Sequence, residues 1–397
     1  MKHIVQQIHF VGIGGAGMSG IAEVLLNLGY QVSGSDLAEG AATKRLKDLG
    51  AVIHIGHDPK NIGTAEAVVI STAVAGNNPE VLAARAAKVP VIQRAVMLGE
   101  LMRLKQGIAI AGTHGKTTTS ALLTTILNAA GRMPSSIIGA ELLGIGVGAA
   151  YGDGSLLVIE ADESDGTLDV LPLRSLIVTN VDIDHLDYFE SFDALKESFA
   201  EAVARTDGSV VLNIDDAGSA HLVQAFAHLD RVSTFGVSPD ASVRVASVLP
   251  TERGIDVQLT VNGNSYLSSL PLRGSHNALN LAAAVAMAVQ LGVDAQIACD
   301  AVASFGGVAR RFTERGNFHG AVLIDDYAHL PAEIAAAIAA AQSHPLATAR
   351  VVAVFQPNRY HRIAAMADSY ADCFTDADRV VITDVYASGT AKIPGIT

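Results

Sequence analysis

Two glycine-rich segments have the residue types and spacing that bind phosphate groups. The first, residues 12–17, reads GIGGAG and follows the apolar residues 8–11. Glycine allows a positive φ and a close approach of backbone to phosphate, and the helix that follows would point free N–H groups at the anion. The spacing, with Asp36 ending the next apolar run, is also typical of NAD sites, where Asp36 would contact a ribose hydroxyl. The diphosphate of a UDP-sugar fits equally well, so the pattern leaves the nucleotide open.

The second segment, residues 112–117, reads GTHGKT and lies between a predicted strand and a predicted helix. It resembles a P-loop, in which backbone N–H groups hold phosphate oxygens. Lys116 would neutralise phosphate charge, and the Thr117 hydroxyl would reach Mg²⁺. The first glycine of the general pattern is replaced by Ile110. The flanking strand and helix favour a nucleotide site over a chance sequence match.

Acidic residues follow two further predicted strands. Glu160 begins the sequence EADESD directly after residues 156–159, where a fold of this kind places a carboxylate that binds a metal. His185 lies in the similar segment NVDIDHLD, residues 180–187. Histidine is a less usual Mg²⁺ ligand than oxygen, so chemistry alone supports a structural role for His185 about equally well.

Three more polar clusters are less specific. They read GSHNALN at residues 274–280, DDYAH at residues 325–329 and NRYHR at residues 358–362. Polar side chains at a helix start are often caps. Arg359 and Arg362, three residues apart, could hold an anion on one helix face, although a solvated basic face has the same pattern.

The elements that position these motifs alternate between short apolar runs and helix-like segments. This alternation predicts an α/β fold with parallel sheets, and 397 residues are enough for two or three domains. The predicted strands are residues 8–11, 31–35, 68–71, 108–111, 156–159, 176–179, 322–324, 351–355 and 379–383. Residues 243–270 alternate apolar and polar side chains around Asn262-Gly263, which predicts an antiparallel pair.

Composition excludes several classes of protein. The formal charge of −13 argues against general binding to nucleic acids or anionic membranes. Cys299 and Cys373 are the only cysteines, which indicates neither disulfides nor a zinc site. The N-terminal residues lack the features of a signal peptide, and no apolar run is long enough to cross a bilayer. We therefore expect a soluble cytoplasmic protein that does not insert into membranes.

In this order, the motifs resemble the Mur ligase family of bacterial cell-wall synthesis, in particular its alanine-adding branch. The matching segments are VGIGGAGMSG, AGTHGKTTT, EADESD, NVDIDHLDY, GSHNALN, RRF, DDYAHLP and PNRYHR. The resemblance runs from residue 8 to about residue 395. It implies a Rossmann-like domain for a UDP-sugar (residues 1–105), a P-loop ATPase-type domain (106–303) and a Rossmann-like third domain (304–397).

The resemblance also implies a set of site residues. Those for ATP are Gly112, Thr113, His114, Gly115, Lys116, Thr117, Thr118, His276, Asn280, Arg311 and Asp326, with His276 and Asn280 at the adenine. Those for the other substrates are Gly12, Gly14, Gly15, Ala16, Gly17, Met18, Ser19, Asp36, Ser71, Tyr327, Arg359 and Arg362. The Mg²⁺ ligands would be Thr117, Glu160 and His185. The catalytic residues would be Lys116, His185, His329, Arg359 and Arg362.

The implied reaction is ATP-dependent ligation of L-alanine to the carboxylate of UDP-N-acetylmuramate through an acyl phosphate. We expect a monomer or weak homodimer. The alternatives are a UDP-sugar-binding protein of the same family with impaired ligase activity and an NAD-dependent oxidoreductase. Leu330 and Asn358 stand where the family usually or often has histidine, and Lys196 is a candidate for a lysine that is carbamylated in sister ligases. Because the chain ends at Thr397, short of the family's usual length, we expect a shortened third domain.

Overall fold

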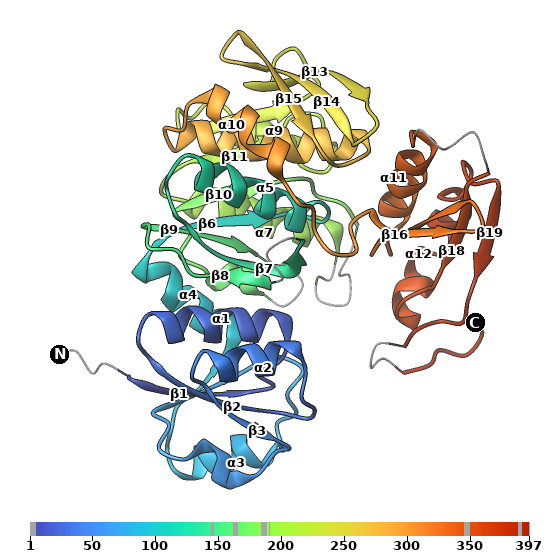
Figure 1. Ribbon diagram of the computed structural model, residues 1–397. Helices are drawn as coiled ribbons and strands as arrows, with labels where there is room; N and C mark the ends of the chain where they lie inside the picture. Colours follow the sequence, from blue (N-terminus) through green and yellow to red (C-terminus); the bar gives the residue numbers. More distant parts are fainter. Residues whose placement is uncertain are drawn as a thin grey trace.

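The structure is a computed structural model that describes residues 5–143, 147–161, 166–183, 189, 191–344, 350–387 and 391–396. Three successive units follow one another along the chain (Figure 1). The first unit, in blue, lies against the second through helix α1, which contacts strands β7 and β8. The third unit, in red, lies beside the second.

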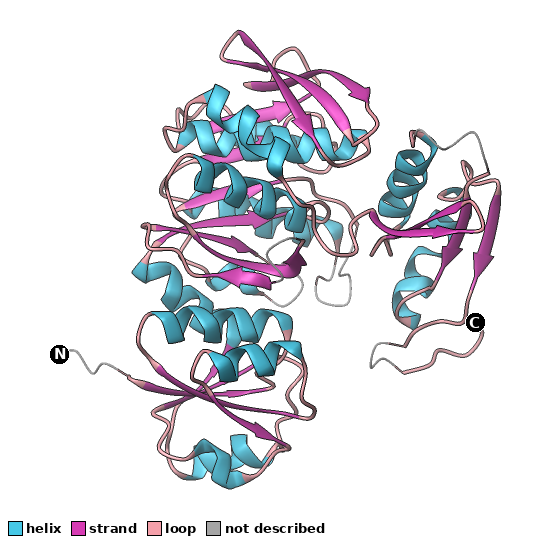
Figure 2. Cartoon of the chain, viewed as in Figure 1, coloured by secondary structure: helices cyan, strands magenta, loops and turns pink. Residues whose placement is uncertain are grey.

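The first unit is a five-stranded parallel sheet with helices on both faces (Figure 2). Its strands, in the order β3-β2-β1-β4-β5, are β1 (Gln7–Val11), β2 (Gln31–Asp36), β3 (Val52–Ile55), β4 (Ala67–Ile70) and β5 (Val91–Gln93). Its helices are α1 (Ala16–Asn27), α2 (Ala41–Asp48), η1 (Pro59–Ile62), α3 (Pro79–Ala86) and α4 (Arg94–Leu104). β1 pairs with β2 on one side and with β4 on the other, so the strand order reverses at β1. A sheet of this type binds its ligand at the carboxyl ends of the strands where the order reverses.

The second unit is a ten-stranded sheet in the order β15-β14-β13-β12-β11-β10-β6-β9-β7-β8. Its strands are β6 (Gln106–Ala111), β7 (Ser135–Leu142), β8 (Val147–Ala150), β9 (Leu156–Glu160), β10 (Ser175–Val178), β11 (Val210–Asn213), β12 (Val232–Gly236), β13 (Val243–Pro250), β14 (Ile255–Val261) and β15 (Asn264–Leu270). β6 pairs in parallel with β9 and β10, so the polar residues after these strands meet at one edge.

Two largely buried helices, α5 (Lys116–Ala129) and α9 (Ser275–Gln290), lie side by side in this unit. Leu122 and Leu123 of α5 and Leu281 and Val285 of α9 are fully buried in one core. This burial on nearly all sides explains why α9 is apolar around most of its circumference. The remaining helices are α6 (Thr167–Val170), α7 (Phe192–Arg205), α8 (Ala220–Phe226), α10 (Ala295–Ala301) and η2 (Val302–Ser304).

The third unit has two small sheets and two helices in the described residues. β16 (Thr313–Phe318) and β17 (Ala321–Asp325) are antiparallel, and β18 (Val352–Phe355) and β19 (Arg379–Ile382) are parallel. The helices are α11 (Pro331–Gln342) and α12 (Tyr360–Asp372). The buried core is small and consists of Ile334, Ile338, Phe355 and Cys373.

The strands predicted from apolar runs are confirmed, with ends that differ by one or two residues. The turn at Asn262-Gly263 is also confirmed, with φ of +49° and +79° between β14 and β15. The prediction of a single antiparallel pair was incomplete. A third strand, β13, pairs with β14 and connects the pair to the main sheet through β12. The exact domain limits at residues 105 and 303 remain predictions. None of the helices in the described part of the chain is long and apolar enough to cross a membrane.

Candidate active site

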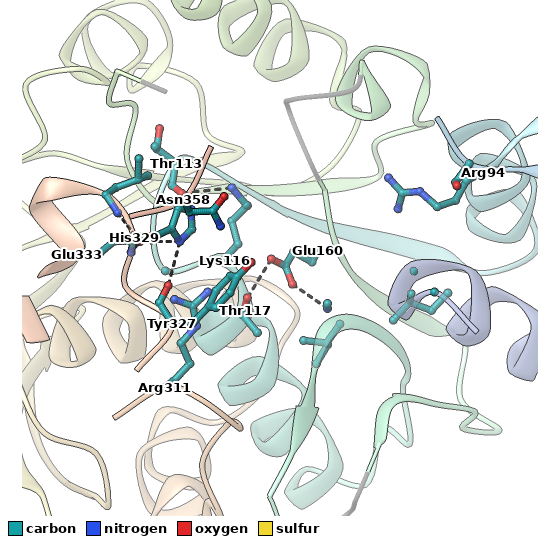
Figure 3. A pocket seen from close by; sticks show the side chains of 18 of the residues that line it. Arg94, Thr113, Lys116, Thr117, Glu160, Arg311, Tyr327, His329, Glu333 and Asn358 are labelled. Carbon is teal, nitrogen blue, oxygen red and sulfur yellow. Dashed lines mark hydrogen bonds and ion pairs between the residues drawn. The ribbon is translucent and has the colours of Figure 1, made fainter. Parts of the chain in front are cut away.

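All three units contribute to one cavity of about 480 Å³. Figure 3 shows Lys116, Thr117 and Glu160 in its middle, with Tyr327 and His329 on one side and Arg94 on the other. The predicted site residues that line it are Gly12, Gly15, Gly17, Met18, Ser71, Thr113, Gly115, Lys116, Thr117, Glu160, Arg311, Tyr327, His329, Arg359 and Arg362. Both glycine segments therefore face the same cavity, although about 100 residues separate them.

The loop of residues 112–116 holds its shape through contacts with the end of β10. Thr113 N donates to the carbonyl of Asn180 at 3.1 Å, and His114 N donates to the Asn180 side chain at 2.8 Å. Gly115 has φ +81°, and an added Cβ would lie 2.3 Å from Asn280 Oδ1. The Lys116 ammonium donates to the Gly112 carbonyl at 2.5 Å, so it lies over the loop whose N–H groups begin α5. This arrangement is typical of a phosphate site.

Two of the three predicted metal ligands are adjacent. Thr117 Oγ1 donates to Glu160 Oε1 at 2.9 Å, and Glu160 Oε2 accepts from Gly139 N at 2.9 Å. A hydroxyl and a carboxylate beside a phosphate loop are the hard oxygen donors that Mg²⁺ prefers, so the residues fit this ion. His185 lies outside the described residues. Among those that are described, no cluster of three His, Cys, Asp or Glu side chains could hold a metal.

A second cavity, of about 230 Å³, lies behind the phosphate loop. The predicted ATP residues that line it are His114, Gly115, Thr118, His276, Asn280, Arg311 and Asp326, beside the apolar Phe235 and Leu279. Burial and the nearby charge of Arg311 lower the pKa of His276 to about 4, so its ring is neutral and offers one donor and one acceptor. Neutral polar groups against an apolar wall suit a planar base.

The first glycine loop turns as expected, with φ +76° at Gly12. Asp36 does not line either cavity. Its carboxylate accepts from Gly14 N at 2.8 Å and from Leu37 N at 2.8 Å, so it organises the loop in this structure. Neither cavity is lined by Gly14, Ser19 or Gly112. The side chain of Ala16 is not among those that the structure describes.

Residues before α11 are fixed by the Asp326 carboxylate, which accepts from Phe312 N at 2.8 Å and Ala328 N at 2.7 Å. Burial nevertheless raises the pKa of Asp326. The Arg310 guanidinium lies 4.5 Å from the centre of the Tyr327 ring. Arg359 has φ +65°, a costly conformation for a residue with a side chain, and its N–H donates to the Tyr386 carbonyl at 2.9 Å. Constrained backbone thus holds the loops that present Tyr327 and Arg359.

Several lining residues were not predicted as site residues. They are Arg94, Leu98, Ile137, Ile138, Gly139, Leu330, Glu333 and Asn358. Arg94 directly follows β5, so the rule that ligands bind at carboxyl ends of strands could have indicated it. The side-chain oxygen of Asn358 is buried without a hydrogen-bond partner among the described residues. Lys196 lines neither cavity. Its Nζ lies 3.5 Å from Asp193 Oδ1 and over the Phe192 ring.

Basic side chains gather in the larger cavity despite the negative charge of the chain. Arg94, Lys116, Arg311, Arg359 and Arg362 line it, against the carboxylates of Glu160 and Glu333. This local excess of positive charge attracts anions and offsets repulsion between two of them.

His114 links the phosphate loop to the third unit. Its Nε2 lies 3.2 Å from Asp182 Oδ2, and its Nδ1 lies 3.3 Å from Glu333 Oε1. Burial opposes a positive charge, but the two hydrogen bonds outweigh it and raise the pKa of His114 to about 9. The same contact holds the pKa of Glu333 well below its usual range, although burial acts in the opposite direction. At neutral pH the three side chains therefore form a charged row.

A Rossmann-like unit and a P-loop unit that open onto one cavity, with a third unit at its rim, define an enzyme class that brings two phosphate-bearing substrates together. Residues 7–106 match the description "Mur ligase family, catalytic domain", residues 110–288 "Mur ligase middle domain" and residues 310–393 "Mur ligase, glutamate ligase domain". The chain belongs to the Mur ligase family. The predicted three-domain α/β architecture is thereby confirmed.

Relatives and solved structures agree with this assignment. The UDP-N-acetylmuramate–L-alanine ligase of Polynucleobacter asymbioticus is 52% identical and covers 100% of this chain and 85% of its own length. That of Rhodopseudomonas palustris is 46% identical over 98% of this chain and 85% of its own length. The crystal structure of the UDP-N-acetylmuramate–alanine ligase of Thermotoga maritima matches with a TM-score of 0.80 and 31% identity. The match covers 96% of this chain and 86% of that one.

Proposed function

We propose that the protein joins L-alanine to the carboxylate of UDP-N-acetylmuramate in an ATP-dependent reaction of cell-wall precursor synthesis. The observation that carries this proposal is the shared cavity, in which the loop at Gly12, the phosphate loop at Lys116 and Arg359 of the third unit face one another. Relatives that are about half identical in sequence carry the name of this reaction. The nucleotide substrates support a cytoplasmic location for the reaction.

The first step transfers the γ-phosphoryl group of ATP to the muramate carboxylate. The carboxylate oxygen forms a bond to phosphorus, ADP leaves, and an acyl phosphate results. Two anions must approach each other for this step, and Lys116, Arg359 and Arg362 reduce their repulsion. Residues 115–118, where α5 begins, would orient the triphosphate through their backbone N–H groups, because those of Thr113 and His114 already donate to Asn180.

In the second step the amine of L-alanine attacks the acyl carbon, the amide bond forms and phosphate leaves with the carboxylate oxygen. Tyr327, His329 and Asn358 line the part of the cavity that the third unit contributes, where we place the amino acid. The buried oxygen of Asn358 is an acceptor suited to an amine N–H. Enclosure by three units would protect the acyl phosphate from water.

We assign Mg²⁺ to Thr117 and Glu160, with His185 as the third predicted ligand. When bound, the ion would supply positive charge to the phosphate oxygens. Glu160 is oriented for this role by Gly139 N, and Thr117 by the first turn of α5. We place the adenine in the second cavity, between His276 and Asn280 on one side and the third unit on the other.

The nicotinamide alternative loses its basis, because it assigns no role to Lys116 or Glu160, and Asp36 is bonded to its own loop. An assay of phosphate release distinguishes an active ligase from a family member with impaired activity. We expect phosphate release only when UDP-N-acetylmuramate, ATP and L-alanine are all present, with glycine and L-serine as comparison substrates.

Replacing Lys116 with alanine tests the division of labour between the two loops. Lys116→Ala should lower kcat by about a hundredfold or more, because it removes a cation at the transferred phosphate. Binding of UDP-N-acetylmuramate, measured by calorimetry, should change by less than about twofold. A wild-type protein that binds the UDP-sugar but releases no phosphate would support impaired activity, and equal loss of both properties would contradict the assignment of the loops.

A further inference from the structure

Glu333 is a buried carboxylate that contacts two functional loops at once. Its side chain is 13% exposed, and it lines both the larger cavity and the second one. One oxygen, Oε1, faces His114 of the phosphate loop at 3.3 Å. The other, Oε2, accepts from His329 N at 3.0 Å and from Leu330 N at 3.3 Å (Figure 3). A single carboxylate thus joins the loop that binds phosphate to the loop that precedes α11.

Both loops are held rigidly on their own side of this carboxylate. The carbonyl of His114 accepts from Thr179 Oγ1 at 2.6 Å and from Asn180 Nδ2 at 3.1 Å, which fixes it to the end of β10. The carbonyl of His329 accepts from Tyr370 Oη at 2.6 Å, which ties it to α12. A shift of the third unit relative to the phosphate loop would therefore have to break the contact between Glu333 and His114.

The contact is charged. Asp182 and Glu333 face the two nitrogens of the His114 ring, so both nitrogens must carry a proton to donate to both carboxylates. His329 Nδ1 lies 3.4 Å from Glu333 Oε2 on the other side. Charge-assisted hydrogen bonds of this kind are about twice as strong as neutral ones when water is largely excluded.

The simpler interpretation is that Glu333 only caps α11. It stands at the third position of the helix, and its carboxylate does accept from the N–H of the capping residue Leu330. A cap needs only an acceptor oxygen, and a neutral amide would serve. The bond to His114 goes beyond that role, because it reaches a different unit of the protein.

We infer that Glu333 is a positioning residue, which sets the Tyr327–Leu330 loop against the phosphate loop through its charged hydrogen bond to His114. This inference rests on the proposed function. Glu333 touches no reacting atom in this account. It holds Tyr327 and His329 at the distance from Lys116 at which amine and acyl phosphate can meet, so its loss should affect turnover more than binding of the UDP-sugar.

Glu333→Gln separates the two interpretations, because glutamine keeps an acceptor oxygen for the helix cap but loses the charge. We expect kcat to fall about tenfold, with KM for UDP-N-acetylmuramate changed by less than about twofold. In a His114→Gln background the same substitution should cost less than about twofold, since its partner is already gone. Equal effects in both backgrounds, or unchanged kcat in the single variant, would overturn the inference.

Asp294→Asn is the matched control. Asp294 caps α10 by accepting from Gln296 N at 2.9 Å and Ile297 N at 3.2 Å, and it lines neither cavity. The same change from carboxylate to amide there should leave kcat and KM unaltered.

A second readout does not need turnover. In protein with ¹⁵N-labelled histidine at neutral pH, both ring nitrogens of His114 should carry protons in the wild type, and one should lose its proton in Glu333→Gln. A neutral His114 ring in the wild type would overturn the inference. Absence of turnover with normal His114 signals would instead contradict the proposed function alone.

Discussion

At the scale of single residues, the local balance of charge in the cavity differs from that of the whole chain. The formal charge of −13 does not indicate an anion site, yet four arginines and Lys116 converge on one cavity. Three of these arginines come from the part of the chain after residue 304 and one from the start of α4. Their convergence explains how an acidic protein can bind two anionic substrates.

His114 should make stability depend on pH in a predictable direction. Its pKa in the folded protein, about 9, is above the ordinary value of 6.5, so the stabilisation is fully present below pH 6.5 and is lost as pH rises through 9. The contribution is at most on the order of 3 kcal/mol. The difference in melting temperature between wild type and His114→Gln should therefore be large in mild acid and small in alkali. A difference that is independent of pH would show that His114 is not charged.

The structure brings together in one cavity the predicted site residues whose motifs are local in sequence, and their roles remain predictions. Lys116 and Thr117 begin the helix after the loop that follows β6, and Glu160 ends β9, so their neighbours in sequence suggested their roles. Glu333 was not predicted, because its sequence context is that of an ordinary helix cap, and its partner His114 is 219 residues away. Only the fold brings those two side chains together.

At the scale of elements, the strand–loop–helix unit formed by β6, residues 112–115 and α5 shapes the predicted phosphate site. The loop needs glycine at Gly115, where the backbone has φ +81° and Asn280 leaves no room for a side chain. Asn280 in turn is placed by α9, which lies beside α5. The geometry of the loop therefore depends on two helices that are far apart in sequence.

Gly115→Ala should raise KM for ATP at least tenfold, because the added Cβ would lie 2.3 Å from Asn280 Oδ1 and must displace either the loop or the amide. Gly263→Ala is a matched control. Gly263 has a similar φ of +79°, but no heavy atom lies within 4 Å of an added Cβ. Both variants carry backbone strain of about 1–2 kcal/mol. Steady-state kinetics should show weakened ATP use in Gly115→Ala only, and similar ATP constants in the two variants would contradict the role of the loop.

Sequence patterns predicted several buried strands because these are continuous apolar runs, as in β6 and β10, although β11, which is equally buried, was not predicted. They did not indicate β16, whose residues TERGNF are mostly exposed and show no apolar alternation. They also missed β12, in which Ser233 and Thr234 are buried although polar. Whether such segments form strands depends on pairing with neighbouring strands, which the sequence of one strand does not show.

At the scale of the whole molecule, the cavity exists only because three units meet. Gly12 and Ser71 come from the first unit, Lys116 and Glu160 from the second, and Arg359 from the third. Each motif could be assigned a chemistry from sequence, but the distances between units depend on how the units pack. The resemblance to a known family supplied that arrangement, since composition and periodicity do not contain it.

This meeting of units lets a carboxylate take a phosphoryl group, which then leaves as phosphate when an amine attacks the acyl carbon. An ¹⁸O label in the carboxylate of UDP-N-acetylmuramate tests it directly, by mass spectrometry of the released phosphate. We predict that one ¹⁸O atom passes to phosphate for each amide bond formed, because the oxygen that attacks phosphorus leaves with it. Release of unlabelled phosphate during amide formation would contradict the account.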